Sequence, residues 1–181
     1  MFHANTQRMI AHWLERKGEA AAPARAQIDP GAFSDLLPQV FILGRLRPGA
    51  YVFRLVGGLV DAVHGGGLAG GDALALWAAP HRASLQLALE AVRRQPEPLI
   101  VTAAGSTSGG RALILEIMLA PLTGANDEID RLFGLYQPAT PVADLTGQPI
   151  ETLAMRAIAT ARPGGVLHRL RLAAVDGRQI A

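Results

Sequence analysis

Two glycine-rich segments contain residue types that are used in ester hydrolysis. His64-Gly65-Gly66-Gly67 resembles the oxyanion-hole motif of lipases, and residues 105–109 (Gly-Ser-Thr-Ser-Gly) resemble a nucleophile elbow. An elbow requires serine at its centre, where this chain has Thr107, and it joins a strand to a helix. Residues 105–109 lie between two predicted strands instead. We therefore interpret both segments as glycine loops, and the sequence predicts no catalytic residue and no enzyme activity.

Metal and thiol chemistry are not predicted either. The five histidines are dispersed, and no His-x-x-x-His spacing or carboxylate cluster accompanies them. The glycines between Gly65 and Gly71 are not followed by the Lys-Ser/Thr pair of a phosphate-binding loop. The chain has no cysteine, which excludes disulfides, thiolate ligands, thiol nucleophiles and flavin–cysteinyl photochemistry.

His81 is the histidine whose position suggests a ligand-binding role. It lies four residues before Leu85 on a predicted helix, so it shares the helix face that is expected to point into the core. An inward imidazole is able to coordinate haem, although the pocket then needs a volume of at least about 300 Å³. A capping or surface histidine at a helix start is the competing interpretation, and it is favoured. His64 is a second, weaker candidate. The cofactor, if there is one, is left open.

An amphipathic helix is predicted over Thr6 to Lys17. Met9, Ile10, Trp13 and Leu14 fall on one face at helical spacing, with charged residues elsewhere around the helix. This apolar stripe has to be covered, either by the chain's own sheet or by another subunit. Both alternatives stay open at the level of the sequence.

The remaining elements are short helices and strands. Strands are predicted over Val40–Leu43, Tyr51–Val56, Leu99–Ala103, Ala112–Ala120 and Ile129–Gln137. Helical segments are predicted after Asp29-Pro30, over Leu59–His64, over Asp72–Trp77 and over Pro80–Arg94. Hairpin connections at both ends of this order indicate an α+β fold. Its antiparallel sheet has about five strands, with short helices on one face and the amphipathic helix at the N-terminus.

One domain with short additions at both ends is predicted. Residues 1–22 form the N-terminal helix and its connector, residues 23–137 the folded domain, and residues 138–181 a C-terminal extension. Within the extension, Met155 to Ala161 is expected to be helical, and Val166 to Val175 has a strand-like alternation interrupted by arginines.

Composition excludes several classes of protein. Half of the 181 residues are apolar, which predicts one folded core. The net charge is only +2, and the arginines are scattered with few aromatic residues between them, so nucleic-acid binding is not expected. No apolar run reaches the roughly 18 residues that cross a bilayer, and polar residues interrupt the first ten positions. We expect a cytoplasmic, soluble protein with no membrane contact.

The order of elements, two strands, several short helices and three antiparallel strands, resembles the PAS domain. The sequence is also similar to a subfamily of single-domain PAS-like proteins common in alphaproteobacteria. The residues that carry this resemblance are Trp13, Pro23-Ala24-Arg25, Ile28-Asp29-Pro30, Leu37-Pro38, Val40-Phe41-Ile42-Leu43 and Phe53-Arg54-Leu55-Val56-Gly57. The resemblance covers roughly Ala11 to Gln137.

One segment departs from the pattern of that subfamily. Where it usually places an Arg–Asp pair ahead of Leu-x-Gly, this chain has His64-Gly65-Gly66-Gly67-Leu68-Ala69-Gly70. Any contact that the charged pair makes is therefore not carried over. The resemblance implies a bacterial sensory or regulatory module that binds a small ligand, a signalling protein or a second copy of itself, without catalysis of its own.

Two sets of residues are predicted to carry this function. The ligand cavity is expected between the sheet and the helices around residues 59–92, lined by Phe53, Leu55, Trp77, His81, Leu85, Leu89, Leu113 and Leu115. The resemblance also implies that the N-terminal helix makes a dimer or partner contact, through Met9, Ile10, Trp13 and Leu14.

Two other functions remain open. A small-ligand carrier or enzyme on a similar curved sheet would need a polar pair inside the cavity, for which the chain offers His64 or His81 with Asp61 or Asp72. A pure interaction scaffold would instead have a filled core and no pocket.

Overall fold

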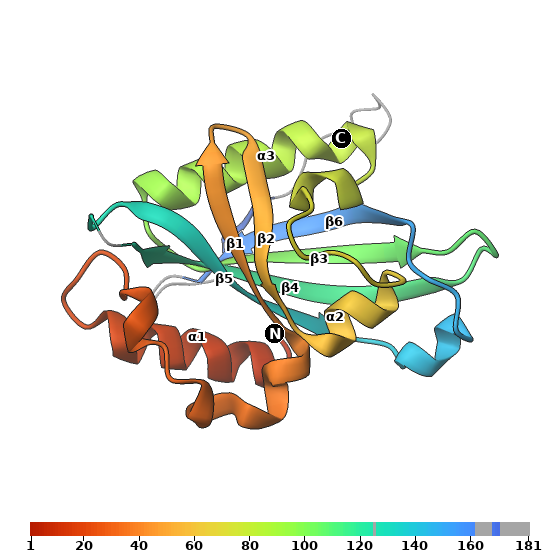
Figure 1. Ribbon diagram of the computed structural model, residues 1–181, viewed down its shortest axis with the longest axis horizontal. Coiled ribbons are helices and arrows are strands. Elements are labelled where there is room, and N and C mark those ends of the chain that lie inside the picture. The colour runs from red at the N-terminus through yellow and green to blue at the C-terminus, as the bar shows by residue number, and fades with distance from the viewer. Residues whose placement is uncertain (125, 162–167, 171–181) are drawn as a thin grey trace.

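A single antiparallel sheet organises the chain. The computed structural model describes residues 1–124, 126–161 and 168–170. Within these residues the sheet has seven strands in the order β2-β1-β5-β4-β3-β6-β7 (Figure 1). The strands are β1 (Val40–Arg47), β2 (Ala50–Val56), β3 (Leu99–Ser106), β4 (Ala112–Thr123), β5 (Ile129–Pro138), β6 (Thr152–Thr160) and β7 (His168–Leu170). The α+β class and the antiparallel sheet predicted from the sequence are confirmed, with more strands than the five expected.

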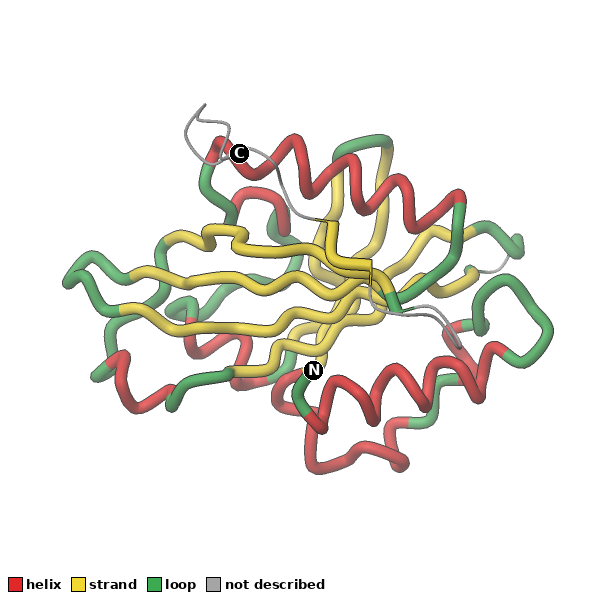
Figure 2. The backbone as a smooth tube through the Cα atoms, turned by 180° about the vertical axis from the view of Figure 1, so that it is seen from behind, coloured by secondary structure: helices red, strands yellow, loops and turns green. Residues whose placement is uncertain are grey.

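Helices cover both faces of this sheet. The α-helices are α1 (Ala4–Lys17), α2 (Gly58–Val63) and α3 (Ala79–Arg94), and the 3-10 helices are η1 (Arg25–Gln27), η2 (Pro30–Gln39), η3 (Ala73–Leu76) and η4 (Val142–Leu145). Helices α2, η3 and α3 pack on one face, called the inner face below. Helices α1 and η2 pack on the opposite, outer face, so that α1 and α3 lie on opposite sides of the strands (Figure 2).

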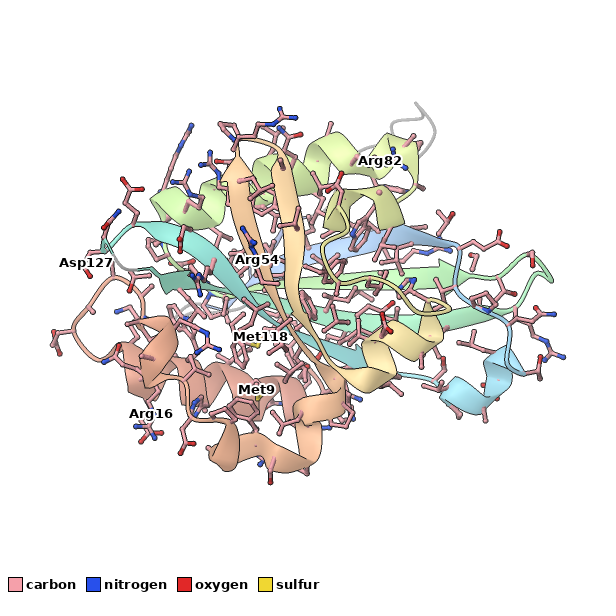
Figure 3. The ribbon with its side chains drawn as sticks, in the orientation of Figure 1. Met9, Arg16, Arg54, Arg82, Met118 and Asp127 are labelled. Atoms are coloured by element: carbon pink, nitrogen blue, oxygen red, sulfur yellow. The ribbon has the colours of Figure 1, made fainter. Side chains whose placement is uncertain are left out.

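The outer face is where the N-terminal helix docks. Met9 and Trp13 are fully buried in the same cluster as Met118 of β4, and Figure 3 shows Met9 and Met118 between α1 and the sheet. The indole Nε1 of Trp13 donates a hydrogen bond of 2.8 Å to the carbonyl oxygen of Pro121. Of the two alternatives for the apolar stripe, the chain's own sheet therefore covers these residues. The prediction that Met9 and Trp13 form a partner face is wrong, because their side chains are inaccessible; Ile10 and Leu14 are partly buried against the same cluster.

The segment after residue 137 is part of the same sheet. Strand β6 pairs with β3 along its full length, from Thr152 opposite Ser106 to Thr160 opposite Leu99. The predicted helix over Met155–Ala161 is wrong, and residues 152–160 are not an appendage to the domain. The reason is that Leu153, Met155 and Ile158 turn toward the inner core, with one extra residue, Arg156, at a bulge.

The strand expected over Val166–Val175 lies only partly within the described residues. His168–Leu170 pair with Ile158–Thr160 as β7, and the rest of that segment lies outside the described residues.

A charged cluster fastens α3 to the β1–β2 hairpin. The Glu90 carboxylate accepts hydrogen bonds from Arg45 (Nε, 2.9 Å; Nη2, 3.1 Å) and from the hydroxyl of Tyr51 (2.7 Å). Arg93 donates to the same carboxylate at 3.2 Å and to the carbonyl oxygen of Ile129 at 2.8 Å. Burial raises the pKa of Glu90, but the hydrogen bonds from Arg45, Tyr51 and Arg93 outweigh it and lower the pKa to about 2. The helix is thus held at both β1–β2 and the start of β5.

Replacing Trp13 by alanine tests the docking of α1. The variant loses a fully buried indole and its hydrogen bond to Pro121, so the free energy of unfolding should fall by about 3–5 kcal/mol. Urea unfolding at pH 7 measures this change. Glu15→Ala, at an exposed position of the same helix, should stay within about 0.5 kcal/mol of wild type. Equal stabilities for the two variants would contradict the docked position of α1.

Replacing Glu90 by glutamine tests the charged cluster. The variant should lose about 1–3 kcal/mol of unfolding free energy at pH 7, because three donors lose a charged acceptor. A carboxyl with a lowered pKa stabilises the fold above its unfolded pKa of about 4.3, and this contribution disappears as the pH falls toward about 2. The difference between wild type and variant should therefore shrink over that pH range.

The control is Asp35→Asn, which removes the exposed ion pair between Arg8 and Asp35. It should change the unfolding free energy less than Glu90→Gln does. A wild-type–variant difference for Glu90→Gln that stays constant from pH 7 to about pH 2 would show that the carboxylate is not held as described.

Candidate functional site

An apolar cavity lies between the inner face of the sheet and helices α2, η3 and α3. It is lined by Phe41, Leu43, Phe53, Val60, Ala73, Leu74, Leu76, Trp77, Leu85, Leu89, Ile117, Leu119, Tyr136 and Leu153. The space open to the centre of a water molecule is about 30 Å³, which is room for on the order of two water molecules. The walls come from both layers of the fold, so any change in its volume has to move α3 or η3 relative to the strands.

Half of the predicted cavity residues line it. Phe53, Trp77, Leu85 and Leu89 are at the cavity wall. Two further predicted residues, Leu113 and Leu115, are fully buried on the inner face but contribute to the packed core rather than to the cavity wall.

Leu55 does not line the cavity because of a β-bulge in β2. Phe53 is paired with Leu43 and Leu55 with Ile42, so Arg54 is an extra residue without a partner across the ladder. Such an insertion reverses the alternation of side chains beyond it. Leu55 consequently follows Ile42 to the outer side of the sheet, where it is 42% exposed. The prediction for Leu55 is wrong for that reason.

His81 also lies away from the cavity. It is in the first turn of α3, where its backbone N–H donates to the carbonyl oxygen of Ala78, and its side chain is partly exposed. Leu85 and Leu89, one and two turns later, are the residues of this face that reach the inner core. A haem macrocycle does not fit a space of about 30 Å³ that has no histidine on its wall. The structure therefore favours the interpretation of His81 as a helix-start histidine.

A histidine–tyrosine pair borders the cavity. The hydroxyl of Tyr136 lies 2.9 Å from Nε2 of His64, and Nδ1 of His64 lies 3.1 Å from the carbonyl oxygen of Ile150. The backbone N–H of Ile150 donates in turn to the carbonyl oxygen of Val63 at 2.7 Å. These contacts join the end of α2, strand β5 and the segment that leads into β6.

The protons of this pair are fixed by its surroundings. A carbonyl oxygen only accepts, so Nδ1 of His64 carries the proton that points to Ile150, and Nε2 accepts the hydroxyl proton of Tyr136. Burial lowers the pKa of His64, against the opposing effects of the Ile150 contact and of Asp61. Burial also raises the pKa of the Tyr136 hydroxyl. At pH 7 both side chains are therefore neutral.

The polar pair that a carrier or enzyme would need is arranged differently. The Asp61 carboxylate accepts a hydrogen bond from the backbone N–H of Leu68 at 2.9 Å and so holds the loop after α2. The Asp72 carboxylate accepts one from the backbone N–H of Leu74 at 3.0 Å, at the start of η3. His64 binds Ile150 and Tyr136 instead. Tyr136 was missed from the sequence because it lies 72 positions from His64. The one signal in the sequence was that Tyr136, an aromatic residue with a polar hydroxyl, lies in a mostly apolar predicted strand.

The loop after α2 is ordered by its own backbone. Gly66 donates to the carbonyl oxygen of Asp61 at 2.8 Å, and Gly70 donates to that of Phe53 at 2.8 Å. Gly65, Gly66 and Gly67 all have φ between +79° and +90°, a region that residues with a Cβ rarely adopt. The loop thus closes against the edge of β2.

Comparison with known proteins decides the family. A family model described as "PAS domain" matches residues 1–137, which is more than half of the chain. The chain belongs to the PAS domain family. The match includes α1 and ends with β5, whereas β6 of this PAS domain extends the same sheet beyond it.

Two solved structures match part of the chain. The LOV protein of Rhodobacter sphaeroides is 12% identical, with a TM-score of 0.46 over 65% of this chain and 72% of that one. An RNA-binding light-oxygen-voltage receptor is 15% identical, with a TM-score of 0.45 over 69% of this chain. The match covers only 37% of the length of that receptor. No curated protein matches the chain.

Among residues 1–124, 126–161 and 168–170, no helix is long and apolar enough to span a membrane. Within the same residues, no group of three or more His, Asp or Glu side chains is arranged to hold a metal ion.

The proton positions of His64 are open to direct measurement. Long-range ¹H–¹⁵N NMR spectra of the imidazole at pH 8 should show the proton on Nδ1, and the titration midpoint should lie below 6.5 because burial disfavours the charged form. In Tyr136→Phe the tautomer should persist, since Ile150 still accepts from Nδ1. A proton on Nε2 in the wild-type protein would contradict the arrangement.

Proposed function

We propose that this PAS domain is a sensory or regulatory module of bacterial signalling. It takes up a small molecule in the cavity between sheet and helices, passes the change to a protein partner or a second copy, and performs no catalysis of its own. One observation carries the proposal: the apolar cavity is walled by the sheet on one side and by η3 and α3 on the other. A ligand there contacts both layers, so its binding acts on their relative position.

The size of the cavity defines how such a module would respond. A space of about 30 Å³ is too small for most metabolites, so a ligand has to prefer a state in which α3 stands further from the sheet. A ligand shifts a conformational equilibrium only by its difference in affinity for the two states. Movement of α3 would reach β1, β2 and β5 through Glu90 and Arg93. Of these strands, β5 contacts α1, whose partly exposed Ile10 and Leu14 remain available to a partner.

A filled interaction scaffold is the second candidate. The same small volume supports it, because a core that is nearly closed needs no ligand for its stability. Such a module would respond to its partner alone.

Filling the cavity with a larger side chain separates the two functions. Leu89 is buried at the cavity wall, and Leu87, on the same helix, is 72% exposed. We expect ¹²⁹Xe NMR to show saturable xenon binding to wild type and to Leu87→Trp. In Leu89→Trp the indole occupies the space, and binding should be lost.

Circular dichroism and urea unfolding establish that both tryptophan variants are folded. Undiminished xenon binding in a folded Leu89→Trp protein would place the site elsewhere. The absence of saturable binding in the wild-type protein would favour the filled scaffold.

A further inference from the structure

The wall of the cavity is apolar except at two side chains. Of its residues, only Trp77 and Tyr136 carry a polar side-chain atom. The indole nitrogen of Trp77 can only donate a hydrogen bond, whereas a tyrosine hydroxyl is able to donate one and to accept others. What the cavity offers a ligand therefore depends on where the proton of the Tyr136 hydroxyl points.

The hydroxyl proton of Tyr136 is donated to His64. The carbonyl oxygen of Ile150 requires a proton on Nδ1 of His64, which leaves Nε2 as an acceptor for Tyr136 at 2.9 Å. The Tyr136 hydroxyl therefore has no proton left to offer. Its remaining capacity is a lone pair on the oxygen, and Tyr136 is one of the residues that line the cavity.

We propose that the cavity selects a small, uncharged, mostly apolar molecule with one N–H or O–H group, whose proton the oxygen of Tyr136 accepts. This inference rests on the proposed function of the cavity as a ligand site. Charged ligands are excluded, since no charged side chain lines the wall to compensate their loss of hydration. At Tyr136, a ligand that only accepts would face a lone pair, so this oxygen favours a ligand that donates over one that only accepts.

Pyrrole and furan are matched probes for this proposal. They are five-membered rings of similar size, but pyrrole donates through its N–H and furan is only able to accept. The probes are titrated separately at pH 8, where His64 is neutral, and amide chemical shifts in ¹H–¹⁵N NMR spectra give the dissociation constants. Pyrrole should bind about three- to tenfold more tightly than furan, the range expected for one net hydrogen bond. Leu89→Ala, which enlarges the cavity, should show the same preference at higher affinity.

Two variants assign the preference to the hydroxyl and its proton. Tyr136→Phe should bind pyrrole and furan with similar affinity. His64→Leu removes the acceptor of the hydroxyl proton, which then becomes free to donate to furan while the oxygen still accepts from pyrrole, so the preference for pyrrole should decrease. The control is Tyr51→Phe, because the Tyr51 hydroxyl binds Glu90 and the residue does not line the cavity. It should keep the wild-type preference, and amide spectra of every variant establish that it is folded.

The possible results separate this inference from the function on which it rests. Equal affinities for the two probes in the wild-type protein, or a pyrrole preference that Tyr136→Phe retains, would overturn the inference while the cavity remains a ligand site. A furan preference that persists in Tyr136→Phe would assign recognition to the indole N–H of Trp77 and also overturn it. No saturable binding of either probe to wild type or Leu89→Ala would overturn the cavity as a ligand site, and the inference with it.

Discussion

The need to cover both faces of one antiparallel sheet determines most of this structure. In β4, Ile117 and Leu119 turn to the inner core while Met118 and Leu122 turn to the outer one, and all four are buried. Burying apolar surface contributes roughly 25 cal/mol per Å², so neither face of such a strand is stable in contact with water. Helix α3 covers one face and α1 the other (Figure 2). The N-terminal helix is therefore part of the core of the PAS domain.

The same constraint explains where prediction from the sequence succeeded. Strands β1 to β5 and helix α3 have strong local periodicity and clear breaks at Pro48-Gly49 and Gly124, and each was found within a few residues of its bounds. Local periodicity does not say which partner covers a helix. The stripe around Trp13 is consistent with a subunit interface or with the chain's own sheet, and only the arrangement of β4 and β5 decides between them.

The errors came from features that depend on distant parts of the chain. A single bulge at Arg54 moved Leu55 to the other side of the sheet, and a bulge at Arg156 interrupted the alternation of buried residues in β6. The pair of His64 and Tyr136 joins two segments 72 positions apart. Phe53, Leu85 and Leu89 were found because each has local neighbours that mark its buried face. Part of the cavity wall could therefore be predicted from the sequence, whereas its polar residue Tyr136 could not.

The proposed ligand site is the space between α3 and the sheet. Native mass spectrometry of the freshly purified protein tests it most directly, with Leu89→Trp analysed beside wild type. We expect a small uncharged molecule to be bound to the wild-type chain, released on denaturation and missing from the variant. A wild-type chain that carries only its own mass, or a bound molecule that the variant retains, would contradict it.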